Sequence, residues 1–237
     1  MNRGLSLVNW NVQWAAPGTA RGRAVMELLA SSSPDVVVLT EGRRDLLPPH
    51  GYVVDAGDDW GYPAISQMRR KVLVWSSHPW NDVDQVGSER MPGGRWVAAT
   101  TLTPVGPVRI AGVCIPWSGA HVTTGRRDRV QWEDHLEYCS ELGPLLRRQS
   151  HPLLVVGDFN QRLPRARQPL SAHSALTTAI DGLRVATEGT TAEGQLIDHI
   201  AHDPTLRCDV TRLLPRQNGS VRLSDHVGVV ADVRRTP

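Results

Sequence analysis

The stretch Pro152-Leu-Leu-Val-Val-Gly-Asp-Phe-Asn160 decides the predicted fold of this chain of 237 residues. Its short apolar run is typical of a buried strand, and Gly157 closes that strand. Asp158 and Asn160 follow at once. They would form an Asx turn, or supply polar groups to a functional site. A strand that crosses a core and ends in such groups places them at the edge of a sheet.

Four more polar groups stand at the ends of predicted strands. Carboxylate and amide oxygens of this kind suit Mg²⁺ or Mn²⁺ better than zinc. An adjacent Asp–His pair adds two groups: a histidine donor that can face a phosphate, and a carboxylate that can pair with the donor. The groups are Asn11 after Leu7-Val-Asn-Trp10, Glu41 after Val36-Val-Val-Leu-Thr40, Asp198 within Leu196-Ile-Asp-His-Ile200, and Asp225-His226 just before a strand at 227–233.

The remaining sequence alternates between strands and a few helices. Apolar spacing of three or four predicts helices at 21–31 and 171–180, and most strongly at 125–150. Further strands are expected at 71–75, 95–103 and 107–115, while 41–70 has the Gly, Pro and Asp content of loops around short strands. No linker or shift in composition divides the chain. We therefore predict one α/β domain that spans residues 1–237.

Composition excludes several classes of protein. With 40% hydrophobic and 21% charged residues, the chain is neither disordered, collagen-like nor a coiled coil. The net charge of +2 is too small to indicate nucleic-acid binding by itself. Lys71 is the only lysine among 26 basic residues. Arginine suits bidentate phosphate contacts, but a genome that favours arginine codons explains the bias equally well.

Sequence features also predict where the protein works. No apolar run approaches the ~18 residues that a membrane-spanning helix needs. Strand-like residues begin at Leu5, which leaves no room for a secretory leader. Cys114, Cys139 and Cys208 are odd in number and lack CxxC spacing, so we expect no disulfide framework or zinc site. These features predict a cytoplasmic protein without a membrane span.

Five short motifs, taken in order, resemble the endonuclease/exonuclease/phosphatase superfamily. That superfamily includes abasic-site endonucleases, pancreatic-type deoxyribonucleases and tyrosyl-DNA phosphodiesterases. The resemblance spans residues 5–233 and implies a four-layer α/β sandwich, in which two packed mixed β-sheets are flanked by helices. It also implies a monomer. The motifs are Trp10-Asn11, Leu39-Thr-Glu41, Gly157-Asp-Phe-Asn160, Ile197-Asp198 and Ser224-Asp-His226.

The resemblance implies a metal site. Glu41 matches the glutamate that would hold Mg²⁺ (or Mn²⁺) against the scissile phosphate. Asn11 matches the asparagine beside that metal, and Asp225 matches a carboxylate that supports the site.

It also implies four catalytic positions. Asp158 matches the aspartate that aligns or deprotonates the attacking water, and Asn160 the amide that helps to fix the phosphate and the nucleophile. His226 matches the histidine that contacts a phosphate oxygen, and Asp198 the carboxylate that orients it. Asn160 and His226 would thus also bind substrate. An aspartate partner raises the pKa of a histidine and favours its charged form, which stabilises charge on phosphoryl oxygens.

Two positions depart from the family pattern. Gln13 stands where many nuclease members carry an acidic residue, which argues against a tightly held second metal. Cys114-Ile-Pro116 matches the Tyr-x-Pro motif of abasic-site enzymes. A cysteine cannot replace the phenol hydrogen bond to phosphate, so abasic-site specificity loses support.

We therefore predict a divalent-metal-dependent phosphoesterase, a hydrolase of phosphoric esters, that cuts phosphodiester bonds of nucleic acid, either DNA or RNA. One alternative is a phosphatase or phosphodiesterase of a lipid or a small phosphorylated metabolite. Another is a degenerate, non-catalytic member that binds nucleic acid or a protein.

Residues outside the motifs carry further expectations. Trp14 and Trp117 lie near predicted strand ends, where an indole can stack on a base, although tryptophan also serves as core. His121 is expected to be an exposed loop histidine. Arg126, Arg127 and Arg129 would open the helix at 125–150, where they oppose its dipole and either face phosphate or pair with Asp128 or Glu133.

Overall fold

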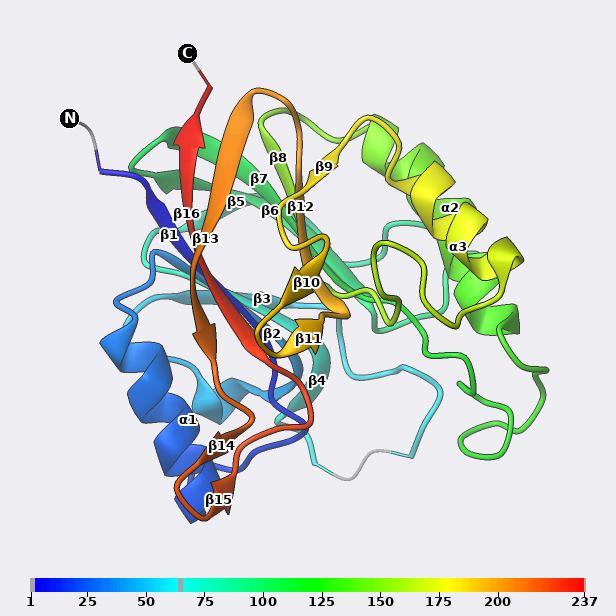
Figure 1. Ribbon diagram of the computed structural model, residues 1–237, viewed down its shortest axis with the longest axis horizontal. Coiled ribbons are helices and arrows are strands. Elements are labelled where there is room, and N and C mark those ends of the chain that lie inside the picture. Colours follow the sequence, from blue (N-terminus) through cyan, green and yellow to red (C-terminus); the bar gives the residue numbers. More distant parts are fainter. Residues whose placement is uncertain (1–2, 64–65, 237) are drawn as a thin grey trace.

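Two six-stranded mixed sheets pack face to face in the computed structural model (Figure 1), which describes residues 3–63 and 66–236. The first sheet has the order β13-β16-β1-β2-β4-β3, and the second has the order β5-β6-β7-β8-β12-β9. The strands of the first sheet are β1 (Leu5–Asn11), β2 (Val36–Arg43), β3 (Tyr52–Asp55), β4 (Arg69–Ser76), β13 (Leu206–Leu214) and β16 (Gly228–Arg235). Those of the second are β5 (Trp80–Asp84), β6 (Trp96–Thr103), β7 (Gly106–Cys114), β8 (Leu153–Asp158), β9 (Arg184–Val185) and β12 (Asp198–His202).

Each sheet mixes parallel and antiparallel neighbours. The pairs β1–β2 and β7–β8 are parallel, whereas β1–β16 and β12–β8 are antiparallel. Two small hairpins, β10 (Thr190–Thr191) with β11 (Gly194–Gln195) and β14 (Gln217–Asn218) with β15 (Val221–Arg222), stand outside the main sheets. A 3₁₀ turn, η1 (Arg44–Leu46), follows β2.

Helices cover the outer faces of the two sheets (Figure 1). Helix α1 (Ala20–Ser31) packs Val25 and Leu29 against the first sheet, in one cluster with Val8 and Val37. Helices α2 (Glu133–Arg147) and α3 (Leu170–Ala179) cover the second sheet. Helix, sheet, sheet and helix make four layers, which confirms the predicted sandwich.

The core between the sheets consists of the apolar, β-branched residues that predicted the strands. Leu7, Val36 and Val74 of the first sheet meet Ile110 and Val156 of the second in one buried cluster. A polar tie crosses this core, because Asn9 Nδ2 of β1 donates to the carbonyl oxygens of Gly157 (3.3 Å) and His199 (3.1 Å). Asn9 thereby fixes β1 against the ends of β8 and β12.

The start of the long helix differs from the prediction. Helix α2 begins at Glu133, not at 125, so the three arginines precede it. Its first turn carries Glu133 and Asp134, whose negative charges favour the amino end of a helix dipole. Arg129 pairs with Glu133 (3.0 Å) and Arg126 with Asp128 (3.1 Å). The prediction that arginines open the helix and oppose its dipole is therefore wrong, and the ion-pair alternative is confirmed for these two.

Candidate active site

The polar strand ends of both sheets meet at one edge of the sandwich. Asp158 is the last residue of β8 and Asp198 the first of β12, and the antiparallel register places them directly opposite each other. Asn11 ends β1 in the other sheet, and its Nδ2 donates to Asp158 Oδ2 at 3.1 Å. All three side chains are buried. The two sheets therefore share one polar cluster at this edge.

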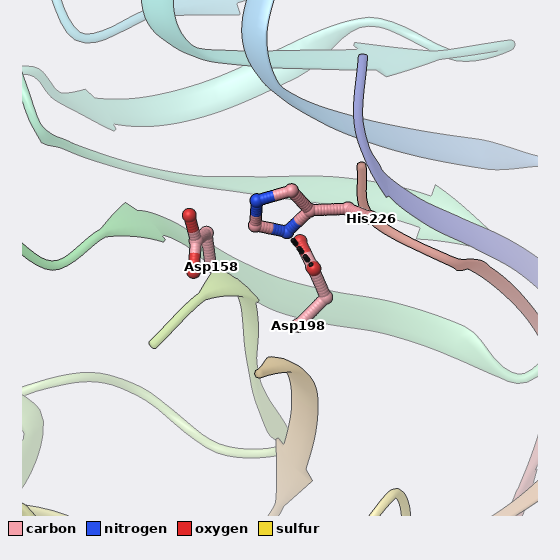
Figure 2. A group of neighbouring side chains, drawn as sticks. All are labelled: Asp158, Asp198 and His226. Atoms are coloured by element: carbon pink, nitrogen blue, oxygen red, sulfur yellow. Dashed lines mark hydrogen bonds and ion pairs between the residues drawn. The ribbon is translucent and has the colours of Figure 1, made fainter. Parts of the chain in front are cut away.

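His226 completes the cluster from the loop before β16. Its Nδ1 lies 2.5 Å from Asp198 Oδ2, and Figure 2 shows the opposite ring nitrogen turned toward Asp158. Ser224 holds the loop, since its Oγ donates to the carbonyl of Asn11 (2.7 Å) and accepts from the His226 N–H (3.0 Å). Ser224 thus fixes the backbone at His226, and Asp198 fixes its imidazole.

The surroundings shift the protonation of the two central groups. Burial and the charge of Asp198 raise the pKa of Asp158 to about 7, although the charge of His226 opposes them. Burial lowers the pKa of His226, but the charge and hydrogen bond of Asp198 outweigh burial and raise that pKa to about 10. Near neutral pH the site therefore pairs a carboxylate that takes up and releases a proton with a stably charged imidazolium.

Asn160 forms a turn directly after β8. Its backbone N–H donates to Asp158 Oδ1 (2.9 Å), which is the bond of an Asx turn, and its φ is +54°. Its Nδ2 donates to the carbonyl of Ile115 (2.8 Å). Together with Asn11, this turn gives each oxygen of Asp158 one hydrogen bond, so the plane of the carboxylate is fixed.

Glu41 lies at the rim of the cluster and is bound to a residue that the motifs did not identify. Its Oε1 accepts from Lys71 Nζ at 2.6 Å, and Lys71 is almost fully buried in β4. The pairing of Thr40 with Val72 and of Gly42 with Arg70 leaves Lys71 opposite Glu41. Lys71 stands out in the sequence as the only lysine. Its pairing with Glu41, however, depends on the register of β2 and β4.

The cluster has the donors that a hard divalent cation takes. Donor atoms of Asp158, Asp198 and His226 lie within 4.8 Å of one another. Within the part of the chain that the structure describes, Asp198 Oδ1 is buried without a hydrogen-bond partner, which leaves this carboxylate to pair with His226 through Oδ2. Asp225 lies at the exposed rim, with its Oδ1 3.8 Å from His226 Nε2. A charged imidazolium cannot ligate a metal, so the oxygens that fit Mg²⁺ or Mn²⁺ are those of Glu41, Asn11 and Asp225 around His226.

Comparison with known proteins agrees with this geometry. Residues 8–226 match the model of the Endonuclease/Exonuclease/phosphatase family. The chain belongs to this family. Its members are hydrolases that act on phosphoesters and generally use divalent metals. No curated protein matches the sequence.

Three similar solved structures share the fold at low identity. The 3′ phosphatase NExo from Neisseria, bound to a product DNA hairpin, is 21% identical over 96% of this chain and 98% of its own, with a TM-score of 0.67. An AP endonuclease from Archaeoglobus fulgidus is 16% identical over 96% and 98%, with a TM-score of 0.66. The endonuclease domain of TRAS1, a telomere-specific non-LTR retrotransposon, is 15% identical over 99% and 100%, with a TM-score of 0.65. None of the helices in the described ranges is long and apolar enough to cross a membrane.

Arg95 is a buried arginine near the candidate active site, at the edge of the sandwich where the polar strand ends meet. Arg95 is 1% exposed, and its Nη1 donates to the carbonyl of Cys114 at 3.3 Å. Cys114 in turn lies opposite Asp158 in the register of β7 and β8. Burial raises the pKa of the Cys114 thiol to about 12, although the charges of Lys71 and Arg95 oppose it, so this cysteine stays neutral.

His121 corrects an expectation. It is 1% exposed, not an exposed loop histidine, and its Nδ1 lies 2.6 Å from Asp134 Oδ2. Arg129 Nε reaches the other oxygen of Asp134 at 2.9 Å, and the Tyr62 ring lies 4.6 Å from the imidazole. These contacts fasten the loop after β7 to the first turn of α2, so His121 has a structural role.

We expect Asp134→Ala to lower the free energy of unfolding by about 3–5 kcal/mol, because His121 and Arg129 then lose a buried charged partner. Urea unfolding measures the change. Asp128→Ala is the matched control, since Asp128 pairs with Arg126 at the surface, and it should leave stability nearly unchanged. Equal effects of the two substitutions would contradict the anchoring role.

Proposed function

We propose that this family member is a divalent-metal-dependent phosphodiesterase that hydrolyses nucleic acid. The observation that carries the proposal is the buried cluster in which Asp158 faces the His226–Asp198 pair. In this cluster the carboxylate of Asp158 is a proton acceptor that titrates near neutral pH, and the imidazolium of His226 is a fixed positive charge. Nucleic acid is the favoured substrate because similar structures include a phosphatase bound to a DNA hairpin and an AP endonuclease.

Asp158 acts as the general base in this proposal. Its carboxylate accepts a proton from a water molecule as the water oxygen attacks phosphorus. A new bond joins phosphorus to that oxygen, and the bond between phosphorus and the leaving sugar oxygen breaks. Asn11 and the backbone of Asn160 hold the carboxylate so that its free lone pairs face the water. A base with a pKa near the working pH is the most effective one.

His226 stabilises the charge that develops on the phosphate. Asp198 occupies Nδ1, so Nε2 is the nitrogen left to donate to a phosphoryl oxygen. Because Asp198 holds this donor in place before the reaction, no reorganisation energy is needed to position it during the reaction. Asn160 lies at the same rim, and its side-chain amide adds a polar contact for the phosphate.

Glu41, Asn11 and Asp225 are the residues that we expect to hold the cation. A bound Mg²⁺ or Mn²⁺ would supply positive charge against the scissile phosphate. Lys71 engages one oxygen of Glu41 and fixes the orientation of its carboxylate.

We expect removal of divalent metal to lower the cleavage rate at least about 100-fold, since metal charge stabilisation contributes several kcal/mol. Purified protein is incubated with single-stranded DNA, supercoiled plasmid, RNA and a chromogenic phosphodiester, each with Mg²⁺, Mn²⁺ or EDTA. His226→Ala serves as the control for contaminating nucleases. Turnover confined to the chromogenic ester would contradict nuclease function and favour a lipid or metabolite substrate. Equal rates in EDTA would contradict metal dependence.

A further inference from the structure

A cleft with aromatic and cationic walls opens beside the metal-binding rim. Its volume is about 350 Å³, which is in the range of small-ligand sites. We call it the aromatic cleft. Its walls include Trp14, Trp60, Tyr62, Trp117, Arg69 and Lys71.

The aromatic rings of the cleft differ in exposure: Trp60 is buried, Trp14 and Tyr62 are half-buried, and Trp117 is exposed. Trp14 and Trp60 stack at 5.7 Å between centroids and 21° between planes. The hydroxyl of Tyr62 contacts the Thr124 hydroxyl at 3.2 Å. Trp117 is 46% exposed, although a tryptophan at the surface leaves a large apolar ring in water. The accessible rings, those of Trp14, Tyr62 and Trp117, are suited to binding a planar partner.

The backbone connects the cleft directly to Glu41. The N–H of Trp14 donates to the carbonyl of Glu41 at 2.6 Å. Gln13, Trp14 and Glu41 all adopt positive φ, at 46°, 62° and 47°, a conformation that is costly for side chains of this size. Strained backbone of this kind is concentrated at functional sites. Trp117, which also lines the cleft, follows β7, whose last residue lies beside Asp158.

Two cations lie against the aromatic wall. The Arg69 guanidinium is 5.1 Å and the Lys71 ammonium 5.3 Å from the centre of the Trp14 ring. Lys71 also binds Glu41, so one ammonium group contacts both the metal-binding rim and the cleft. Arg69 has no ion-pair partner among residues 3–63 and 66–236. Proteins that bind single-stranded nucleic acid use aromatic rings, on which the bases stack, beside cationic groups that attract the phosphate backbone.

We propose that the aromatic cleft binds a nucleobase of a single-stranded substrate, next to the phosphodiester that is cut. This inference rests on the proposed function. An aromatic site would also suit the quaternary ammonium of a choline lipid. Glu41 compensates the charge of Lys71, but Arg69, which no carboxylate pairs with among residues 3–63 and 66–236, repels such a cation and attracts the phosphates that flank a base. The charges therefore favour the nucleotide.

Binding without turnover tests the proposal independently of catalysis. The probes are a labelled single-stranded thymidine oligonucleotide and a matched oligonucleotide whose central bases are replaced by abasic tetrahydrofuran. Fluorescence anisotropy in EDTA gives the Kd of each. We expect Trp14→Ala and Trp117→Ala to weaken binding of the thymidine probe by about 10- to 100-fold, the effect of losing a base–aromatic contact. Binding of the abasic probe should change much less.

Tyr52→Ala is the matched control. Tyr52 is a 49% exposed aromatic residue that pairs with Ser76, at the end of β4 opposite to Arg69. Trp117→Ala keeps the test valid if Trp14→Ala fails to fold, because an exposed side chain can be removed with little cost. The proposal would be overturned if Trp14→Ala and Trp117→Ala bound both probes with the same Kd as Tyr52→Ala does. Equal losses on the two probes would also overturn it.

Two further outcomes separate the cleft from the active site. In the first, Trp14→Ala and Trp117→Ala lose the binding to phosphatidylcholine vesicles that the wild type shows, but still bind the oligonucleotide. This result would place a lipid headgroup in the cleft and overturn the proposal. Base-dependent binding that requires Trp14, in a protein that cleaves no nucleic acid with Mg²⁺ or Mn²⁺, would support the cleft and overturn the proposed nuclease function. The two claims can therefore fail separately.

Discussion

Asp158→Asn is expected to lower kcat by about 10²–10⁴-fold, the contribution of a positioned general base. The amide keeps the shape of the carboxylate but cannot accept the proton of the attacking water. Cleavage of the preferred substrate from the metal-dependent panel measures the loss. Asp209→Asn, which changes a surface carboxylate bound to Arg207, is the control and should retain the full rate.

The same substitution should reduce the dependence of stability on pH. The pKa of Asp158 is raised to about 7 in the folded protein, against about 4 for an unfolded aspartate. The folded state therefore holds an extra proton between these values, and stability falls as pH rises through this range. Asn carries no charge to bury, so urea unfolding should show a smaller loss of unfolding free energy between pH 4 and about pH 7 for Asp158→Asn than for the wild type. A variant that keeps the full rate would contradict the role as base, and one that loses as much stability over this pH range as the wild type would contradict the raised pKa.

His226→Gln is expected to lower kcat by about 10²–10³-fold and also to destabilise the fold. Glutamine cannot carry the positive charge that faces the phosphate. It also leaves Asp198, which is 2% exposed, without its charged partner. Initial rates and urea unfolding measure the two effects separately.

The pH dependence of stability distinguishes the ion pair from simple packing. The pKa of His226 is raised to about 10 from an ordinary value near 6.5. The stability that it contributes is therefore complete below pH 6.5 and is lost as pH rises to about 10. The difference in unfolding free energy between wild type and His226→Gln should be largest near pH 6 and disappear near pH 10. A constant difference would contradict the ion pair. His50→Gln, at an exposed histidine, is the control.

Much of the fold could be predicted because its signals are local. An apolar, β-branched run that stops at a polar residue, such as 153–158, identifies a buried strand and the group at its end. The cluster around Asp158 follows from the same pattern, since Asn11, Asp198 and His226 all adjoin such strands. Their order along the chain pointed to the family, which the match over residues 8–226 confirms.

The features that could not be predicted depend on pairing between distant segments. Lys71 meets Glu41 only because β2 and β4 pair in one register. His121 is buried because the loop after β7 packs against Asp134 of α2, a contact that no local pattern encodes. The stacking of Trp14 on Trp60 likewise joins two loops. A residue type alone does not tell whether tertiary packing will cover it.

Hydrolysis in ¹⁸O-enriched water tests the central claim most directly, namely that water attacks phosphorus with Asp158 as the base. A single turnover is run with the preferred nucleic acid, and the products are analysed by mass spectrometry. We predict one ¹⁸O atom in the phosphate of the product from the wild type, and almost no product from Asp158→Asn. A product phosphate that contains only ¹⁶O would contradict the account, because a substrate hydroxyl and not water would then have attacked.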